Sequence, residues 1–241
     1  MRTANPALRS DTFTSTQVGI GEEPMTIAGT VQKSFTLLAI TMLTAGLTWT
    51  RAGALTTPLL IGGAIGGFIV ALVLCFKKTW APALAPAYAL LEGLFLGGLS
   101  KQYEAAFGGI VLQAVMLTFG TFLALLATYQ AGFIRATENF KLGIVAATGG
   151  IFVVYLLTFV LGFFGIHIPY IHGSGPIGIG FSIVVVIIAA LNLVLDFDFI
   201  EKGAENRAPR YLEWYAAFGL LVTLVWLYIE ILRLLAKLRQ R

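Results

Sequence analysis

Seven apolar runs divide this chain, each close to the length of a helix that crosses a lipid bilayer. About 20 apolar residues cross the roughly 30 Å of hydrocarbon in a membrane, and long unbroken runs favour helices over the alternating strands of a barrel. Hydrophobic residues make up 58% of the 241 residues and charged residues only 12%, against about 25% charged residues in soluble proteins. We therefore predict an all-α integral membrane protein with seven transmembrane helices, at residues 31–50, 55–76, 82–101, 108–131, 143–165, 176–199 and 211–236.

The polar segment at residues 1–30 lacks the apolar core of a cleavable signal peptide. We predict that it is a disordered cytoplasmic tail, because it has too few large apolar side chains to pack. Residues 31–241 are then one seven-helix transmembrane domain, since the short connections leave no room for a soluble domain. The single cysteine, Cys75, excludes an intramolecular disulfide.

The distribution of Lys and Arg predicts the orientation, because cytoplasmic loops are enriched in both residues. Internal loops on the side of the N-terminus carry seven basic residues, from Lys77 to Arg210, and the opposite loops carry two, Arg51 and Lys101. The N-terminus is therefore expected in the cytoplasm. The basic C-terminal tail disagrees, because seven spans place it outside; the alternative is a last segment that re-enters without crossing.

Three pairs of glycines lie four residues apart within the apolar runs, at Gly62 and Gly66, Gly63 and Gly67, and Gly93 and Gly97. Such spacing lets helix backbones approach closely in a membrane. We interpret these glycines as helix-packing residues rather than as a phosphate loop, because the run GGAIGG lacks the strand and the lysine of a nucleotide site.

Acidic side chains within the apolar runs are candidate functional residues, because a charge inside a bilayer is costly. Glu92 lies mid-span, where it either lines a polar cavity or is a neutral acid hydrogen-bonded between helices. Asp196 and Asp198 end the sixth run and point about 200° apart on a helix. Asp196, the deeper of the two, is the functional candidate, and Asp198 is expected to pair with Lys202.

Two further acids lie in the seventh run. Glu213 opens it, where a carboxylate interacts favourably with the helix dipole. Glu230 lies three residues before Arg233, and we expect a local ion pair between them.

Catalytic and metal-binding patterns are weak in this sequence. His167 and His172 are five residues apart, and we interpret them as interfacial loop residues rather than metal ligands. Ser174 lacks the surroundings of a nucleophile elbow, and no H-E-x-x-H motif occurs. We expect no enzymatic activity and no cofactor. The dispersed basic residues also argue against a nucleic-acid partner.

The last two runs, LNLVLDFDFIEKGAENRAPRYLEWYAAFGLLVTLVWLYIEILRLL, resemble the end of Bax inhibitor-1 family proteins, and more closely the bacterial YccA-like branch of that family. The opening NPAL…F…MTIAGTVQKS and the third-run ALLEGLFLGGLSKQYE resemble the same branch. The resemblance covers nearly the whole chain. It implies six helices around a central seventh and a place in a bacterial inner membrane.

Some members of this family are pH-sensitive calcium leak channels, in which two aspartates on the last two helices form a latch near a basic residue. The resemblance puts the first aspartate at Asp196 and the basic residue at Lys77 or Lys78. The second aspartate position falls on Thr223, so the second acid is missing, and Glu213 is the candidate replacement.

Two functions follow from the resemblance. One is a calcium or cation leak pathway with acidic residues at its cytoplasmic mouth. The other is a non-transporting modulator of a membrane AAA protease or another membrane partner, a role that the tail at residues 1–30 would suit. Because Thr223 does not titrate near neutral pH, a leak in this protein is expected to depend less on pH than in relatives with both aspartates.

Overall fold

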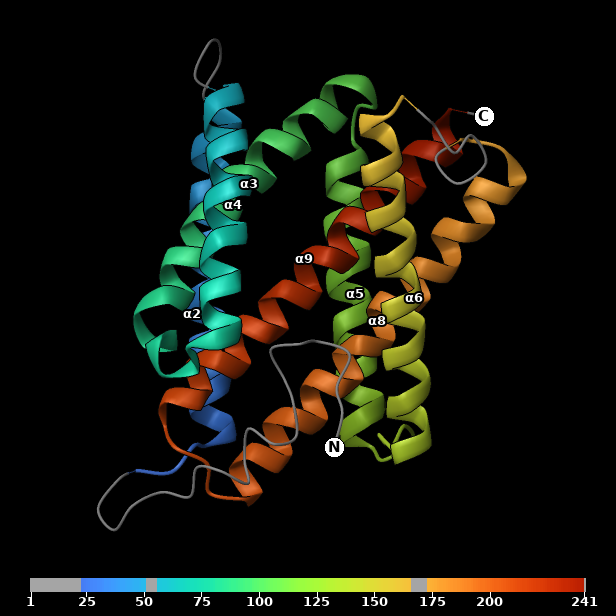
Figure 1. Cartoon of the computed structure of the whole chain (residues 1–241). Coiled ribbons are helices and arrows are strands. Elements are labelled where there is room, and N and C mark those ends of the chain that lie inside the picture. Colours follow the sequence, from blue (N-terminus) through green and yellow to red (C-terminus); the bar gives the residue numbers. More distant parts are fainter. Residues whose placement is uncertain (1–22, 51–55, 166–172, 241) are drawn as a thin grey trace. The chain divides into compact units, whose positions relative to one another are not determined.

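The structure, a computed structural model, describes residues 23–50, 56–165 and 173–240 (Figure 1). The described residues form seven long α-helices and one short 3-10 helix, η1, at Lys78–Trp80. They contain no β-strand, only one isolated bridge between Pro24 and Pro209. The prediction of an all-α fold is confirmed. The α-helices are α2 (Ile27–Thr50), α3 (Thr56–Phe76), α4 (Ala81–Ala106), α5 (Ile110–Gln130), α6 (Glu138–Phe163), α8 (Pro176–Glu205) and α9 (Tyr211–Arg239).

Six of these helices, α3 to α6, α8 and α9, are long and apolar enough to cross a membrane. Helix α2 coincides with the first predicted span and, with 24 residues, is about 36 Å long at 1.5 Å per residue. It is not among these six helices because it carries Gln32, Lys33 and several threonines, among them the buried Thr30, Thr41, Thr44 and Thr48. Their hydroxyls donate hydrogen bonds to backbone carbonyls one turn earlier, and the Thr41 hydroxyl also lies 3.2 Å from the Ala89 carbonyl oxygen of α4.

The helix ends extend beyond several predicted boundaries. Helix α6 begins at Glu138, five residues before the predicted start at residue 143. The Thr137 hydroxyl caps this end by accepting a hydrogen bond from the Phe140 backbone N–H at 3.3 Å. Helices α4 and α8 likewise continue to Ala106 and Glu205. Polar residues at the ends continue a helix without prolonging its apolar run, so hydropathy alone places these boundaries too early or too late.

Helix α2 begins at Ile27, inside the segment assigned to the tail. The Thr26 hydroxyl accepts a hydrogen bond from the Gly29 backbone N–H at 2.9 Å, which is a helix N-cap. The boundary at residue 30 is therefore corrected to residue 26. Disorder of the tail stays a prediction for residues 1–22, which lie outside the described residues.

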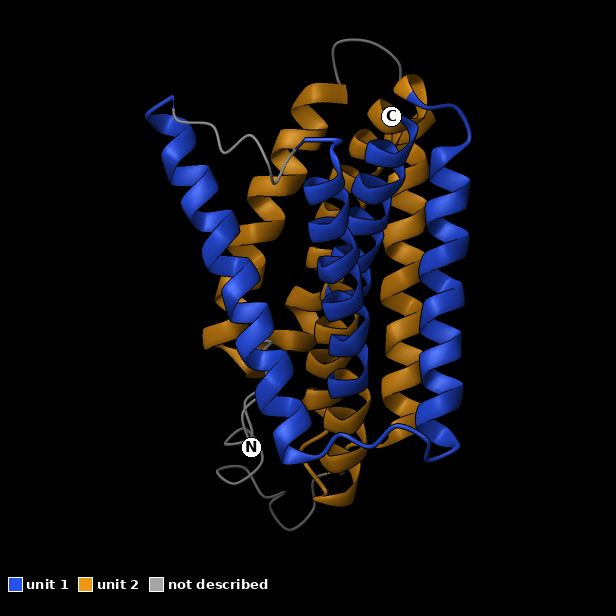
Figure 2. Ribbon diagram, turned by 90° about the vertical axis from the view of Figure 1, so that its right-hand side faces the viewer, with its two compact units in different colours: residues 1–5, 107–195, 223–241 blue, residues 6–106, 196–222 orange. Residues whose placement is uncertain are grey.

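The chain forms two compact units (Figure 2). Unit 1 comprises described parts of residues 107–195 and 223–241, and unit 2 comprises described parts of residues 6–106 and 196–222. Helix α8 passes from unit 1 to unit 2 after Leu195, and α9 returns to unit 1 at Thr223. The chain therefore does not divide at a single linker.

Close packing through glycine holds α2, α3 and α4 together in unit 2. A Cβ atom at Gly93 or Gly97 of α4 would overlap Thr44 or Ala45 of α2. A Cβ at Gly63 of α3 would lie 2.6 Å from the Leu91 carbonyl oxygen of α4. The predicted role of these glycines in helix packing is confirmed, except at Gly62, which has no neighbouring atom within 4 Å.

Burial differs sharply between the helices. Large apolar side chains are exposed along α5 and α6, among them Leu112, Met116, Phe152 and Phe159. In water such surfaces are unfavourable, whereas in a bilayer they are lipid-facing. Most residues of helix α9 are buried instead.

Candidate functional site

The two aspartates of α8, which lie about two turns before its end at Glu205, have different surroundings. Asp196 is 2% exposed, and it follows the buried residues Ala189 and Asn192 on one face of the helix. Asp198 points elsewhere, and its carboxylate lies 2.9 Å from the Lys202 ammonium one turn later. The predicted pair of Asp198 with Lys202 is confirmed. Asp196 is therefore the buried acid of this pair of residues.

Glu92 lies at the contact between α4 and α3. Its side chain is 8% exposed, and a Cβ at Gly67 of α3 would lie 3.2 Å from its Oε2 atom. The Tyr88 hydroxyl, one turn earlier on α4, hydrogen-bonds to this carboxylate. The Tyr88 ring packs edge-on against Phe218 at a centroid distance of 4.9 Å. The hydrogen bond to Tyr88 lies within α4, so it is a local bond next to the contact with α3 rather than the bond between helices that the second interpretation of Glu92 expects.

Glu213 binds the beginning of α2. Its Oε1 atom accepts hydrogen bonds from the backbone N–H of Thr26 at 2.8 Å and from the Thr26 hydroxyl at 3.0 Å. Its Oε2 atom forms an ion pair with the Lys33 ammonium. Gly29 leaves room for the carboxylate, because a Cβ at that position would overlap it. Both oxygens of Glu213 are thus engaged by α2 and its cap, which argues against Glu213 as the partner of Asp196.

A short segment before α2, Glu23–Thr26, runs along the connection between α8 and α9, and we call it the N-terminal strap. The Met25 backbone N–H donates to the Ala208 carbonyl oxygen at 2.6 Å, and the Met25 side chain is buried. Glu23 forms an exposed ion pair with Arg210. Sequence reasoning missed this strap because backbone pairing between distant segments leaves no hydropathy pattern.

Of the two lysines suggested by the family resemblance, Lys78 is the one that contacts α9. Its ammonium lies 5.7 Å from the centroid of the buried Tyr215 ring, a cation–π geometry. Lys77 is exposed. Thr223, at the position of the missing second acid, is buried at 4% exposure.

A second group of polar side chains lies in unit 1. The Tyr155 hydroxyl of α6 donates to Glu230 Oε1 at 3.0 Å, and the Arg233 guanidinium lies 2.9 Å from the same oxygen. The predicted pair of Glu230 with Arg233 is confirmed, and Tyr155 is an addition. One turn later the Lys237 ammonium donates to the Ser182 hydroxyl at 2.9 Å. The spacing of residues 230, 233 and 237 on one helix face is the signal that could have revealed this group.

Metal-binding geometry does not occur among the described residues, where no three His, Cys, Asp or Glu side chains come together. His167 and His172 lie outside those residues.

Comparison with known proteins identifies the family. Curated proteins give no match to this chain. A family profile described as Bax inhibitor 1 like matches residues 5–240, which is nearly the whole sequence. The all-helical fold with long apolar helices agrees with the fold that the sequence resemblance implies. The chain belongs to the Bax inhibitor 1 like family.

Proposed function

We propose that this protein is a leak pathway for calcium or another cation, with Asp196 as its principal carboxylate. The observation that carries the proposal is the burial of Asp196 in a helix apolar enough to cross a membrane. An ionisable residue in such a position is costly and marks ion pathways in membrane proteins. Calcium is a hard cation that prefers oxygen ligands such as carboxylates.

A second polar residue on the buried face of α8 supports a path along this helix. Asn192 is buried on the same face as Asp196. Asn192 donates a hydrogen bond to the Thr148 hydroxyl at 2.9 Å. No cluster of three acidic or metal-ligating side chains occurs in the described ranges. Weak, dispersed oxygen ligands suit conduction, since an ion must leave each site as readily as it enters.

The proposed location is a bacterial inner membrane with the N-terminus in the cytoplasm. The excess of Lys and Arg in the loops from Lys77 to Arg210 supports this orientation. The closer resemblance to the YccA-like branch supports the bacterial membrane. In this orientation Asp196 lies toward the cytoplasmic end of α8.

Calcium flux into liposomes that contain only the purified protein tests this proposal. We expect the wild type to admit calcium faster than empty liposomes, Asp196→Asn to slow the flux severalfold, and Asp198→Asn to leave it nearly unchanged. Asp198 is the matched control because it is two residues away but paired with Lys202 at the surface of the helix. A wild-type flux equal to that of empty liposomes would refute the leak pathway.

The second candidate function is modulation of a membrane protease or another partner. The N-terminal strap favours it, because Met25 is bound to the α8–α9 connection immediately after the tail. A partner that binds the tail would therefore be coupled through Met25 to the α8–α9 connection. Co-reconstitution with a membrane AAA protease would test this role, with a chain that lacks residues 1–22 as the comparison. A change in proteolysis that needs the tail, without calcium flux, would favour this function over the leak.

A further inference from the structure

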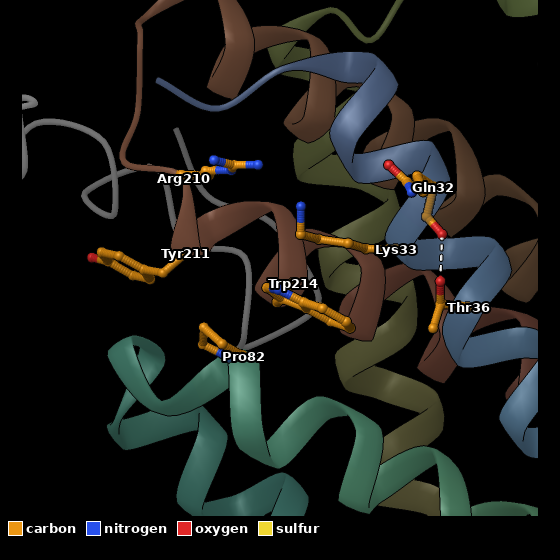
Figure 3. Close-up of a pocket in the computed structure, with 7 residues that line it drawn as sticks. All are labelled: Gln32, Lys33, Thr36, Pro82, Arg210, Tyr211 and Trp214. Carbon is orange, nitrogen blue, oxygen red and sulfur yellow. Dashed lines mark hydrogen bonds between the residues drawn. The ribbon is translucent and has the colours of Figure 1, made fainter. Parts of the chain in front are cut away.

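A cleft of about 520 Å³ opens in unit 2 at the beginning of α2 and α9 (Figure 3). Its polar lining includes Gln32, Lys33 and Thr36 from α2 and Arg210 before α9. Two aromatic side chains, Tyr211 and Trp214, also line the cleft. Neither the proposed leak pathway nor the pair of aspartates uses this cleft.

Two cationic groups from separate segments meet in the cleft. Figure 3 shows the Arg210 guanidinium and the Lys33 ammonium on the same side of the Trp214 ring. The Lys33 ammonium lies 5.6 Å from the centroid of that ring, which helps to hold it in place. A guanidinium presents five N–H donors in a planar fork that matches the oxygens of a phosphate.

The carboxylates around the cleft determine the net charge of the ligand that the cleft can bind. Glu213 is buried and bound to Lys33 and Thr26, so it stays in place. Glu23 pairs with Arg210 where both side chains are well exposed, at 70% and 62%. Exposed ion pairs contribute little to stability, so a ligand can displace Glu23. Lys33, Arg210 and Glu213 then carry one net positive charge, which matches the single negative charge of a phosphodiester.

The position of the cleft favours a lipid over a free phosphate. It lies at the ends of helices that cross the membrane, the level at which headgroups are found. Tyr and Trp are enriched at this level because their rings have an apolar body and a polar edge. On α2, next to the cleft, Val31 and Phe35 are exposed at 45% and 68%. These side chains offer an apolar surface to the acyl chains of a lipid whose headgroup lies in the cleft.

The geometry points to a binding site for the phosphodiester of an anionic phospholipid headgroup in the cleft formed by Lys33, Arg210, Tyr211 and Trp214. Arg210 and Lys33 bind the phosphate oxygens, and the aromatic rings flank the headgroup. Glu23 competes with the lipid for Arg210.

Native mass spectrometry of the full chain with phosphatidylglycerol in detergent tests this site. We expect Arg210→Gln to weaken binding about tenfold, since a hydrogen bond to a charged group is lost. Arg207→Gln is the matched control, because it removes the same charge from an exposed position three residues earlier that does not line the cleft. Equal weakening by both variants would overturn the site, because it would indicate nonspecific attraction.

Glu23→Gln gives a test that does not depend on a damaging change. It removes the competing carboxylate at an exposed position, so we expect tighter binding of phosphatidylglycerol. Unchanged or weaker binding would contradict the competition between Glu23 and the lipid.

Two further arms identify the source of the phosphate. We expect phosphatidylglycerol to outcompete phosphatidylcholine, and millimolar inorganic phosphate to leave lipid binding unchanged. Displacement of the lipid by inorganic phosphate would overturn the lipid assignment in favour of a free anion. In a variant that keeps Trp214 and carries Trp49→Phe, Trp80→Phe and Trp226→Phe, brominated phosphatidylglycerol should quench the remaining fluorescence. Unquenched Trp214 fluorescence would place the lipid elsewhere.

Discussion

Lys33 of α2 and Glu213 of α9 form an ion pair although 180 residues separate them in the sequence. The Glu213 side chain is 3% exposed and also accepts two hydrogen bonds from Thr26. One carboxylate thus joins the first turn of α9 to the N-cap of α2. This arrangement explains why a glutamate is tolerated at a buried position: three donor groups, the Thr26 backbone N–H, the Thr26 hydroxyl and the Lys33 ammonium, compensate for its lost hydration.

Replacing Lys33 should show how much its ion pair with Glu213 stabilises the protein. We expect Lys33→Met to lower the free energy of unfolding by about 3 kcal/mol, because a buried carboxylate loses its counter-charge. Reversible denaturation in mixed micelles would measure the change. Lys202→Met is the control, since its partly exposed pair with Asp198 should cost only about 0.5 kcal/mol. Equal losses in the two variants would show that the Lys33 pair is no more than a surface contact.

The glycines of α4 should be sensitive to a single methyl group. We expect Gly97→Ala to destabilise the protein by about 2 kcal/mol, because the new Cβ overlaps the backbone of Ala45 and forces α2 away. Gly62→Ala has open space and should be neutral or stabilising by about 0.5 kcal/mol. Thermal unfolding in detergent would compare the two. A larger loss at Gly62 would contradict the α2–α4 contact described above.

The pH response of a leak should be weak in the wild type. Two close carboxylates titrate as a coupled pair, but the family position of the second acid is occupied by Thr223, whose hydroxyl does not titrate in this range. We expect calcium flux at pH 6, 7 and 8 to differ little in the wild type and strongly in Thr223→Asp.

Glu213→Gln provides the contrasting variant for this pH experiment. Because both Glu213 oxygens bind Thr26 and Lys33, we expect the substitution to leave the pH response unchanged. A steep wild-type response that disappears in Glu213→Gln would instead identify Glu213 as the missing acid.

Cysteine labelling should establish the orientation. After Cys75→Ser, we expect Ala106→Cys to react with an impermeant reagent from outside and Asn139→Cys only from the cytoplasm. Both positions are exposed at helix ends, whereas Ser100, a natural choice from the sequence, is buried in the extended α4. Outside labelling of Asn139→Cys would reverse the topology.

The helices and the contacts within each helix follow from local sequence patterns. Apolar runs of span length require backbone hydrogen bonds to be satisfied within one segment, so they fold as helices wherever they occur. The pairs of Asp198 with Lys202 and of Glu230 with Arg233 follow from helical spacing alone.

The contacts between residues far apart in the sequence depend instead on how the helices pack. Nothing local links Lys33 to Glu213 or Tyr155 to Glu230, because such contacts depend on how helices pack. The same holds for glycine: Gly62 and Gly63 are neighbours in the sequence, yet only Gly63 faces α4. Hydropathy measures how strongly a helix prefers an apolar environment to water. In a bilayer, lipid chains and neighbouring helices provide that environment equally well. The identity of each partner therefore comes from packing and polar complementarity, which the linear pattern does not encode.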